Sequence, residues 1–133
     1  IKRYIDDTIE STRERGYAAT LLGRRRYFPL INASNRGLRT AAERAAINMP
    51  IQGSAADMIK LAMHNIHAAL KKNKLKSRMI LQVHDELVFD ALKSELKELK
   101  LLILENMQNA LTLPNQVPVI AECGEGENWL EAH

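Results

Sequence analysis

The segment MILQVHDELVFD, residues 79–90, places side chains that could do acid–base or metal chemistry in the middle of an apolar stretch. Two runs rich in β-branched and large apolar residues, 79–83 and 86–89, flank the pair His84-Asp85. This pattern predicts a β-hairpin with a two-residue turn. Such turns favour Asn-Gly or Asp-Gly, because their central residues need unusual backbone angles. The pair His-Asp departs from this preference, as residues at functional sites do more often than others.

The carboxylate of Asp85 is the candidate metal ligand of this hairpin. An aspartate at a hairpin tip is ionised at neutral pH, and two strands would hold it rigidly, which suits a divalent cation. Glu86 adds a second carboxylate, but neighbouring residues of a strand point to opposite faces. Both can therefore serve one metal only if the turn twists them together. The alternative is a solvated turn whose polar residues have no role.

A second set of polar side chains, Arg44, Asn48 and Gln52, is spaced by four residues within a helical pattern. Each step turns a helix by about 400°, so the three drift by only ~80° in total and line one polar ridge. All three donate hydrogen bonds. In the DNA minor groove every base pair presents acceptors at similar positions, so such donors can grip a correctly shaped pair without reading its sequence. The alternative is an exposed helix face.

Three consecutive arginines, Arg24, Arg25 and Arg26, form the densest positive cluster in the sequence. In an extended segment, side-chain alternation points Arg25 to one side and its two neighbours to the other. Contact with a nucleic-acid backbone would then involve one face of the segment. The alternative is a solvated or salt-bridged surface.

The arginine cluster is predicted to follow a first helix, residues 1–15, which carries a stripe of isoleucines and ends at Gly16. Two short extended segments, 19–22 and 25–28, are joined around a glycine-arginine pair. The chain begins inside a helical pattern, with neither a methionine nor a capping residue. This beginning predicts a segment cut from a longer protein.

A long helix over residues 38–72 is predicted to carry the ridge. Pro50 and Gly53 should interrupt it with a kink, because an interior proline removes a hydrogen bond and costs roughly 3 kcal/mol. An apolar stripe then resumes, formed by Ala55, Ile59, Ala62, Ile66 and Leu70. His64 and His67 are interpreted as exposed helical residues, because no carboxylate motif joins them into a metal site.

The remaining elements predict an α+β fold. An amphipathic helix starts near Ser94, and residues 117–123, bounded by prolines, read as a strand beside the hairpin. The hairpin and this strand would form a small antiparallel sheet packed against the long helices. Cys123 is expected to be a small buried residue of that strand. The only internal boundary that the sequence indicates is the arginine-rich loop.

Composition places the chain among ordinary globular proteins, with 133 residues, 46% hydrophobic and 26% charged. No apolar run approaches a membrane span of roughly 20 residues. A single cysteine fits a reducing cytoplasm. Charge is uneven, because residues 1–78 carry 16 Lys/Arg against 6 Asp/Glu and residues 79–133 carry 3 against 10. A basic first part and an acidic second part suit a protein that binds a polyanion and metal cations.

Several segments together resemble one known family. QVHDELVFD at 82–90, AERAAINMPIQGSAADMIKLAM at 42–63, LGRRRYFPLINAS at 22–34 and the terminal GENWLEAH are similar to the C-terminal part of bacterial DNA polymerase I, the family A DNA polymerases. The resemblance covers nearly all 133 residues and keeps the segments in the family's order. It implies that the chain forms the later part of the palm together with helices from the fingers. Within it, residues 1–37 would form a helix and the arginine-rich loop, residues 38–72 the long kinked helix, and residues 79–133 the palm-like hairpin, helix and strand.

The reaction that this resemblance implies is template-directed addition of deoxynucleotides to a primer 3′ hydroxyl. Two Mg²⁺ ions, about 3.5–4 Å apart, would serve it, with Asp85 as a ligand, Glu86 in support and His84 positioning the primer terminus. The intact R-x-x-x-N-x-x-x-Q pattern implies contacts with primer–template DNA. Deoxynucleoside triphosphates are the implied substrates.

Two family motifs do not occur in this sequence, namely the one with the other metal-binding aspartate and the helix that holds the incoming nucleotide. A second hypothesis is therefore a non-catalytic nucleic-acid-binding module, and a third is a structural helical adaptor. Salt separates these two, because a phosphate binder loses affinity steeply as salt rises and an adaptor need not.

Residues 1–133 alone are expected to show no measurable primer extension, because the missing motifs supply a metal ligand and the nucleotide grip. The measurement is incorporation by the purified chain with Mg²⁺, with contaminating polymerase excluded. Metal-dependent incorporation would contradict this expectation. Apolar surface left exposed should also make the isolated chain self-associate, and a clean monomer at high concentration would count against that.

Overall fold

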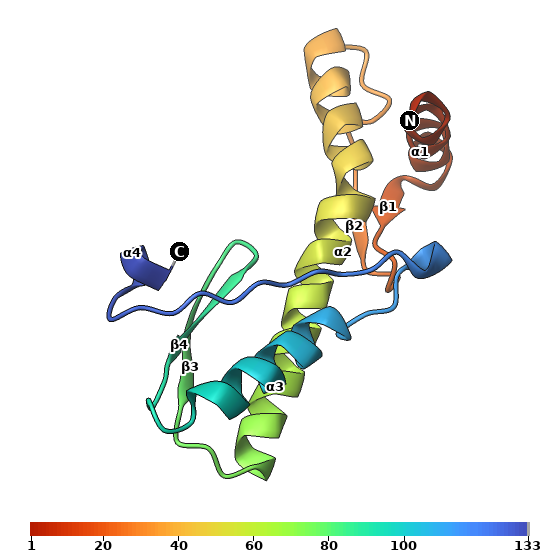
Figure 1. The fold of residues 1–133 in the computed structure, drawn as a ribbon. Helices are drawn as coiled ribbons and strands as arrows, with labels where there is room; N and C mark the ends of the chain where they lie inside the picture. Colours follow the sequence, from red (N-terminus) through yellow and green to blue (C-terminus); the bar gives the residue numbers. More distant parts are fainter. Residues whose placement is uncertain (133) are drawn as a thin grey trace. The chain divides into compact units, whose positions relative to one another are not determined.

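The computed structural model describes residues 1–132, and Figure 1 gives the order of their helices and strands. The elements are α1 (Lys2–Arg15), β1 (Tyr17–Ala19), β2 (Arg25–Tyr27), α2 (Arg36–Lys72), β3 (Arg78–Val83), β4 (Glu86–Asp90), α3 (Leu96–Gln108), the 3-10 turn η1 (Pro114–Gln116) and α4 (Trp129–Ala132). The chain divides into two compact units, Ile1–Asp57 and one that begins at Met58, so that the division falls inside α2 and not at the arginine-rich loop. The predicted α+β class is confirmed.

The first unit joins α1 to a small hairpin. Gly16 ends α1 in the left-handed conformation at φ 76°, as expected of a glycine after the last helical turn. Strands β1 and β2 pair antiparallel, with Tyr17 opposite Tyr27. The first strand lies earlier than the predicted residues 19–22. The reason is a longer turn, in which Thr20 donates its backbone N–H to the carbonyl of Arg24 at 2.9 Å and Gly23 adopts φ 80°.

Helix α2 begins with a side-chain cap, since the Asn35 side-chain oxygen accepts the N–H of Leu38 at 3.2 Å. The helix is continuous through Pro50, in agreement with the single long helix predicted for residues 38–72, and the kink stays a prediction. Buried neighbours explain why the proline is tolerated, because Ala46 and Met49 pack in the core of the first unit just before it. In proteins most of a helix's stability comes from such packing of an apolar face.

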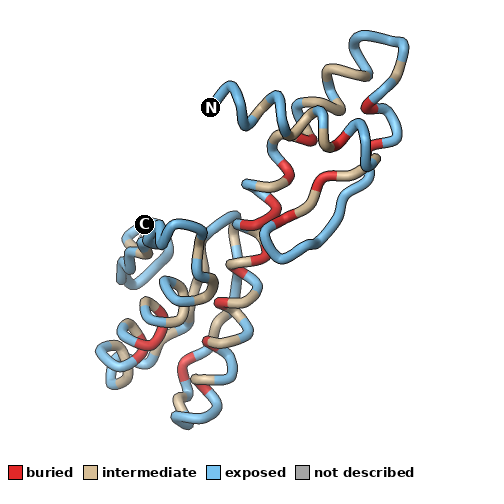
Figure 2. The backbone as a smooth tube through the Cα atoms, turned by 90° about the vertical axis from the view of Figure 1, so that its right-hand side faces the viewer, coloured by how far each residue is buried: buried red, intermediate tan, exposed pale blue. Residues whose placement is uncertain are grey.

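Apolar spacing places the cores of both units. The first core consists of Ala18, Phe28, Ile31, Ala46 and Met49. The second unit buries the predicted stripe of α2 against α3, and this core consists of Ala62, Ile66, Leu70, Leu99, Leu102 and Ile103. Figure 2 shows the buried positions of the long helix recurring between exposed ones, as an amphipathic helix requires. Ile59 also is buried, and Ala55 is the one predicted stripe residue that is exposed.

The second unit contains the predicted central hairpin. Strands β3 and β4 pair antiparallel, with Val83 opposite Glu86 and a register shift between Met79 and Leu81. Leu87 and Phe89 of β4 pack against the second core. The hairpin is thereby attached to the helices of the second unit through β4.

Three details near the C-terminus differ from the sequence analysis. The third strand is absent from the described residues, where both sheets have two strands. Gln108 donates to the carbonyl of Ala121 at 3.4 Å, and Pro118 has no N–H for a ladder. Cys123 is consequently exposed. Helix α3 begins at Leu96 rather than near Ser94.

Candidate functional site

The tip of the β3–β4 hairpin combines an unusual backbone with exposed polar side chains. His84 has φ 53°, a left-handed conformation that is uncommon for a residue with a side chain. The side-chain amide of Gln82 donates to the carbonyl of His84 at 2.8 Å and holds the turn. Sequence analysis did not identify Gln82, although a polar side chain two residues before a strained turn is a usable signal. The tip is thus a braced turn.

This turn presents Asp85 to solvent. Asp85 and His84 are exposed and Glu86 is half-buried, so the two carboxylates have different surroundings. Within the described residues, no group of three or more histidines, cysteines, aspartates or glutamates could hold a metal ion. A carboxylate oxygen is nevertheless the donor that Mg²⁺ takes, commonly from one or two protein carboxylates, with water and substrate phosphate as further ligands. Asp85 therefore fits as one ligand of a site completed by other groups.

The base of the hairpin is fixed by Glu95, which sequence analysis did not single out. Its carboxylate accepts the N–H of Lys76 at 3.0 Å, and the N–H and hydroxyl of Ser77 at 2.9 and 2.6 Å. The Ser77 hydroxyl in turn accepts the N–H of Leu92 at 3.0 Å. One carboxylate thus ties the segment before β3 to the segment after β4. The hydrogen bond from the Ser77 side chain, followed by those from the two backbone N–H groups, lowers the pKa of Glu95.

This pKa shift predicts loss of stability in acid. Because the folded state favours ionised Glu95, the contribution is fully present above the ordinary pKa of 4.5 and is lost as pH falls below it. Glu95→Gln should lower stability at neutral pH and flatten the decline in stability as pH falls below 4.5. Urea unfolding at several pH values measures this. Glu98→Gln, an exposed glutamate of the same helix, is the matched control and should keep the wild-type slope.

The predicted ridge forms on α2 as expected. Arg44, Asn48 and Gln52 are all exposed, whereas Ala46 and Met49 between them are buried. Among the described residues, none of the three ridge side chains has a hydrogen bond or ion pair. A shallow hollow of about 480 Å³ adjoins the ridge, lined by Arg36, Gly37, Thr40, Ala41 and Arg44. The ridge can therefore offer its donors to a partner.

The three arginines divide as strand alternation predicts. Arg24 donates to the carboxylate of Asp57 at 2.7 Å and to the carbonyl of Gly53 at 3.0 Å, so two of its donors are used inside the first unit. Arg26 lies over the ring of buried Phe28, with 5.3 Å from its guanidinium carbon to the ring centroid. Arg25 lies over Tyr17 at 4.5 Å. Arg24 is therefore salt-bridged, which is the alternative that the sequence left open for the arginine cluster. Contact between Arg24 and DNA stays a prediction.

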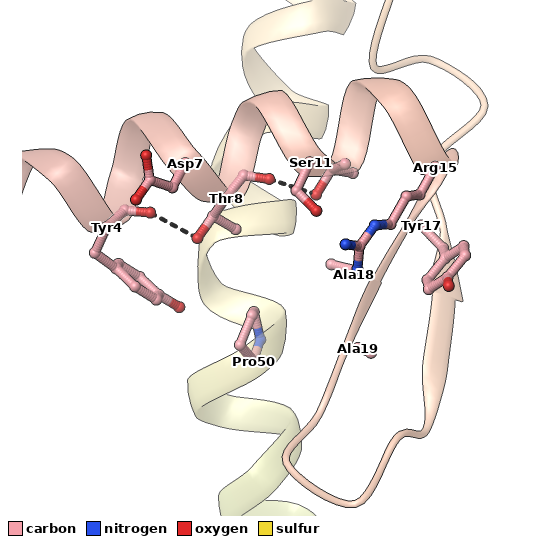
Figure 3. A pocket seen from close by; sticks show the side chains of 10 residues that line it. Tyr4, Asp7, Thr8, Ser11, Arg15, Tyr17, Ala18, Ala19 and Pro50 are labelled. Atoms are coloured by element: carbon pink, nitrogen blue, oxygen red, sulfur yellow. Dashed lines mark hydrogen bonds between the residues drawn. The ribbon is translucent and has the colours of Figure 1, made fainter. Parts of the chain in front are cut away.

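A further hollow of about 330 Å³ lies between α1, β1 and Pro50. Figure 3 shows Tyr4 and Thr8 of α1 on one side of it and Tyr17 on another. The Thr8 hydroxyl donates to the carbonyl of Tyr4 at 2.6 Å, an ordinary contact within a helix. The predicted site residues are not among those that line this hollow.

The ridge and the arginines belong to the first unit, and the hairpin tip belongs to the second. Each unit positions its own residues by local pairing and packing. In the part of the chain that the structure describes, no helix is long and apolar enough to cross a membrane.

Comparison with known proteins gives consistent results. The family model for DNA polymerase family A matches residues 1–131. The chain is 48% identical over 129 residues to DNA polymerase I of Mycobacterium leprae. This alignment covers 97% of this chain and 14% of the relative. For DNA polymerase I of Bacillus subtilis the identity is 46% over 132 residues, covering 99% of this chain and 15% of the relative. The chain therefore spans only 14–15% of the length of these relatives.

One solved structure is similar over nearly the whole chain. It is the polymerase domain of Pol1 from M. smegmatis, in complex with DNA primer-template and dNTP. The TM-score is 0.93 and the sequence identity is 50%, and the match covers 98% of this chain and 23% of that one.

Proposed function

The chain belongs to DNA polymerase family A, and from this premise we propose that it forms the C-terminal segment of a DNA-directed DNA polymerase. The complete enzyme adds deoxynucleotides to a primer 3′ hydroxyl under the direction of a template. The observation that carries the proposal is the braced hairpin tip, where a turn with His84 at φ 53° presents Asp85 to solvent. Strain of this kind persists where the surrounding structure enforces it, and it is concentrated at functional sites.

Asp85 is the proposed metal ligand. Bound Mg²⁺ would supply activation of the hydroxyl and stabilisation of the leaving pyrophosphate. The chain's own residues would hold the metal ion and orient the primer terminus. Asp85 provides charged oxygen on a turn held by Gln82, Glu86 supports it from the first position of β4, and His84 positions the primer's terminal sugar or phosphate. The other ligands of the proposed two-ion site would come from outside the described residues.

Primer–template DNA is the proposed partner, with deoxynucleoside triphosphates as substrates of the complete enzyme. Arg44, Asn48 and Gln52 would donate to minor-groove acceptors, because they are exposed and uncommitted to contacts within the described residues. Arg25 and Arg26 would contact phosphate, with Arg24 securing their strand. In this proposal residues 1–37 and 38–72 serve DNA, and residues 79–133 form the catalytic part.

The proposed compartment is the cytoplasm, where a free thiol such as that of Cys123 stays reduced. The second candidate function is a non-catalytic nucleic-acid-binding module, favoured by the basic balance of residues 1–78. Primer extension by the full-length protein with Mg²⁺ distinguishes the two. Template-dependent incorporation supports the polymerase, whereas salt-sensitive DNA binding without incorporation supports the binding module.

A further inference from the structure

The β1–β2 hairpin has an outer face on which the proposed phosphate contact of Arg25 leaves the two tyrosines unexplained. Tyr17 and Tyr27 are cross-strand partners, and Arg25 lies two residues before Tyr27, so all three share one face of the ladder. The two tyrosine rings meet edge to face, with centroids 5.8 Å apart and an interplanar angle of 62°. Tyr27 is 66% exposed. An aromatic ring and a guanidinium plane are thus displayed together to solvent.

The opposite face of the hairpin attaches it to the core of the first unit. Ala18 and Phe28 are buried in the core of the first unit, and the N–H of Phe28 donates to the carbonyl of Gly16 at 2.9 Å. The turn is tied to α2 through Arg24, and also by the N–H of Leu21, which donates to the Ser54 hydroxyl at 2.9 Å. The outer face is therefore held in place before any partner arrives, which lowers the entropic cost of binding.

The positive charges of Arg25 and Arg26 are not neutralised by the carboxylates that pair with other arginines of the first unit. Asp7 pairs with Arg3, Glu43 pairs with Arg13 and Arg39, and Asp57 pairs with Arg24. Among the described residues, Arg25 and Arg26 have ring contacts and no carboxylate partner. The positive charge of Arg25 beside the exposed Tyr27 ring complements a base with its phosphate.

We propose that Tyr27, with Arg25 stacked over Tyr17, forms a platform for unpaired nucleobases of single-stranded DNA. This inference rests on the proposed function, and the strand concerned is the single-stranded template beyond the primer. An unpaired base stacks on the Tyr27 ring or on the outer plane of the Arg25 guanidinium, and the positive charge of Arg25 attracts the adjoining phosphate. Paired bases cannot use the platform, because their faces are covered by neighbouring pairs. Stacking accepts every base, as copying requires.

The test uses the full-length protein that contains this segment and compares Tyr27→Ala with Tyr27→Phe. Binding is measured by fluorescence anisotropy on two DNAs with the same duplex, one with a 5′ single-stranded template extension and one blunt. Tyr27→Ala should weaken binding to the extended DNA by roughly 5- to 150-fold, the range for loss of one stacked base. Binding to blunt DNA should stay unchanged. Tyr27→Phe keeps the ring and should bind both DNAs like the wild type.

Arg25→Lys separates stacking from charge, because it keeps the positive charge and removes the plane. It should weaken binding to the extended DNA while leaving the salt dependence unchanged. Equal losses on extended and blunt DNA would overturn the platform and indicate a structural role for Tyr27. If Tyr27→Ala binds both DNAs as tightly as the wild type does, the platform is also overturned, and the outer face of the hairpin would bind another kind of partner. In either case, incorporation by the wild type leaves the proposed polymerase function standing.

Discussion

Asp85→Asn is expected to lower the rate of nucleotide incorporation by roughly 10²–10³-fold or more, the scale for removing one group that stabilises developing charge. The substitution keeps the shape of the side chain and removes a charged oxygen ligand. The geometry of the turn should survive, because the braces are a backbone carbonyl of His84 and the side chain of Gln82. Affinity for primer–template DNA should change little, since the proposed DNA contacts come from other residues.

The measurement is single-turnover incorporation alongside DNA binding, in the full-length protein that contains this segment. Glu86→Gln should cost less, because Glu86 begins β4 and its side chain starts on the opposite face of the strand from that of Asp85. Asp90→Asn is the matched control, since Asp90 lies at the other end of the same strand in an exposed pair with Arg78 at 3.6 Å. Near-normal turnover of Asp85→Asn would remove the metal assignment and leave the strained turn unexplained.

Arg44→Ala and Gln52→Ala are expected to weaken primer extension by roughly 1–3 kcal/mol per lost contact, with no change in sequence preference. The physical reason is that minor-groove acceptors occupy similar positions in every base pair, so the ridge contributes affinity and shape selection without reading bases. Both side chains are exposed and have no partner within the described residues, so their removal should cost little stability.

The ridge is tested by extension kinetics on templates that differ in the base pair at the primer terminus. Lys97→Ala serves as a control for charge, because Lys97 is an exposed cation on α3, outside the ridge. Unfolding measured for each variant checks that the fold is retained. If both ridge variants extend primers as fast as the wild type, the ridge is a solvated helix face.

Local patterns were sufficient for most of the helices and strands. The two apolar runs flanking His84-Asp85 placed the central hairpin with its turn, and the glycine after α1 ended that helix where expected. The four-residue spacing of the ridge placed its three members on the exposed side of α2. These features succeed because they depend on the period of a helix or a strand, which neighbouring residues alone determine.

Features that depend on distant partners needed the tertiary structure. Pro50 lies inside α2, whose neighbouring residues Ala46 and Met49 pack in the first core, and residues 117–123 form no strand in the described sheets. The role of Arg24 is decided by Asp57, 33 residues away, and the base of the hairpin is held by Glu95, 18 residues beyond Ser77. No local period marks such contacts.

The sequence alone therefore determined which residues form the hairpin and the ridge, and what chemistry their types permit. The tertiary structure decided how those residues are supported, and it also separated arginines used within the protein from arginines left for a partner. Arg24, Arg25 and Arg26 are identical in type and adjacent in sequence, yet one is bound to a carboxylate and two lie over aromatic rings. The reason is that a side chain's role follows from which groups folding brings within hydrogen-bonding distance, and this depends on contacts between distant segments of the chain.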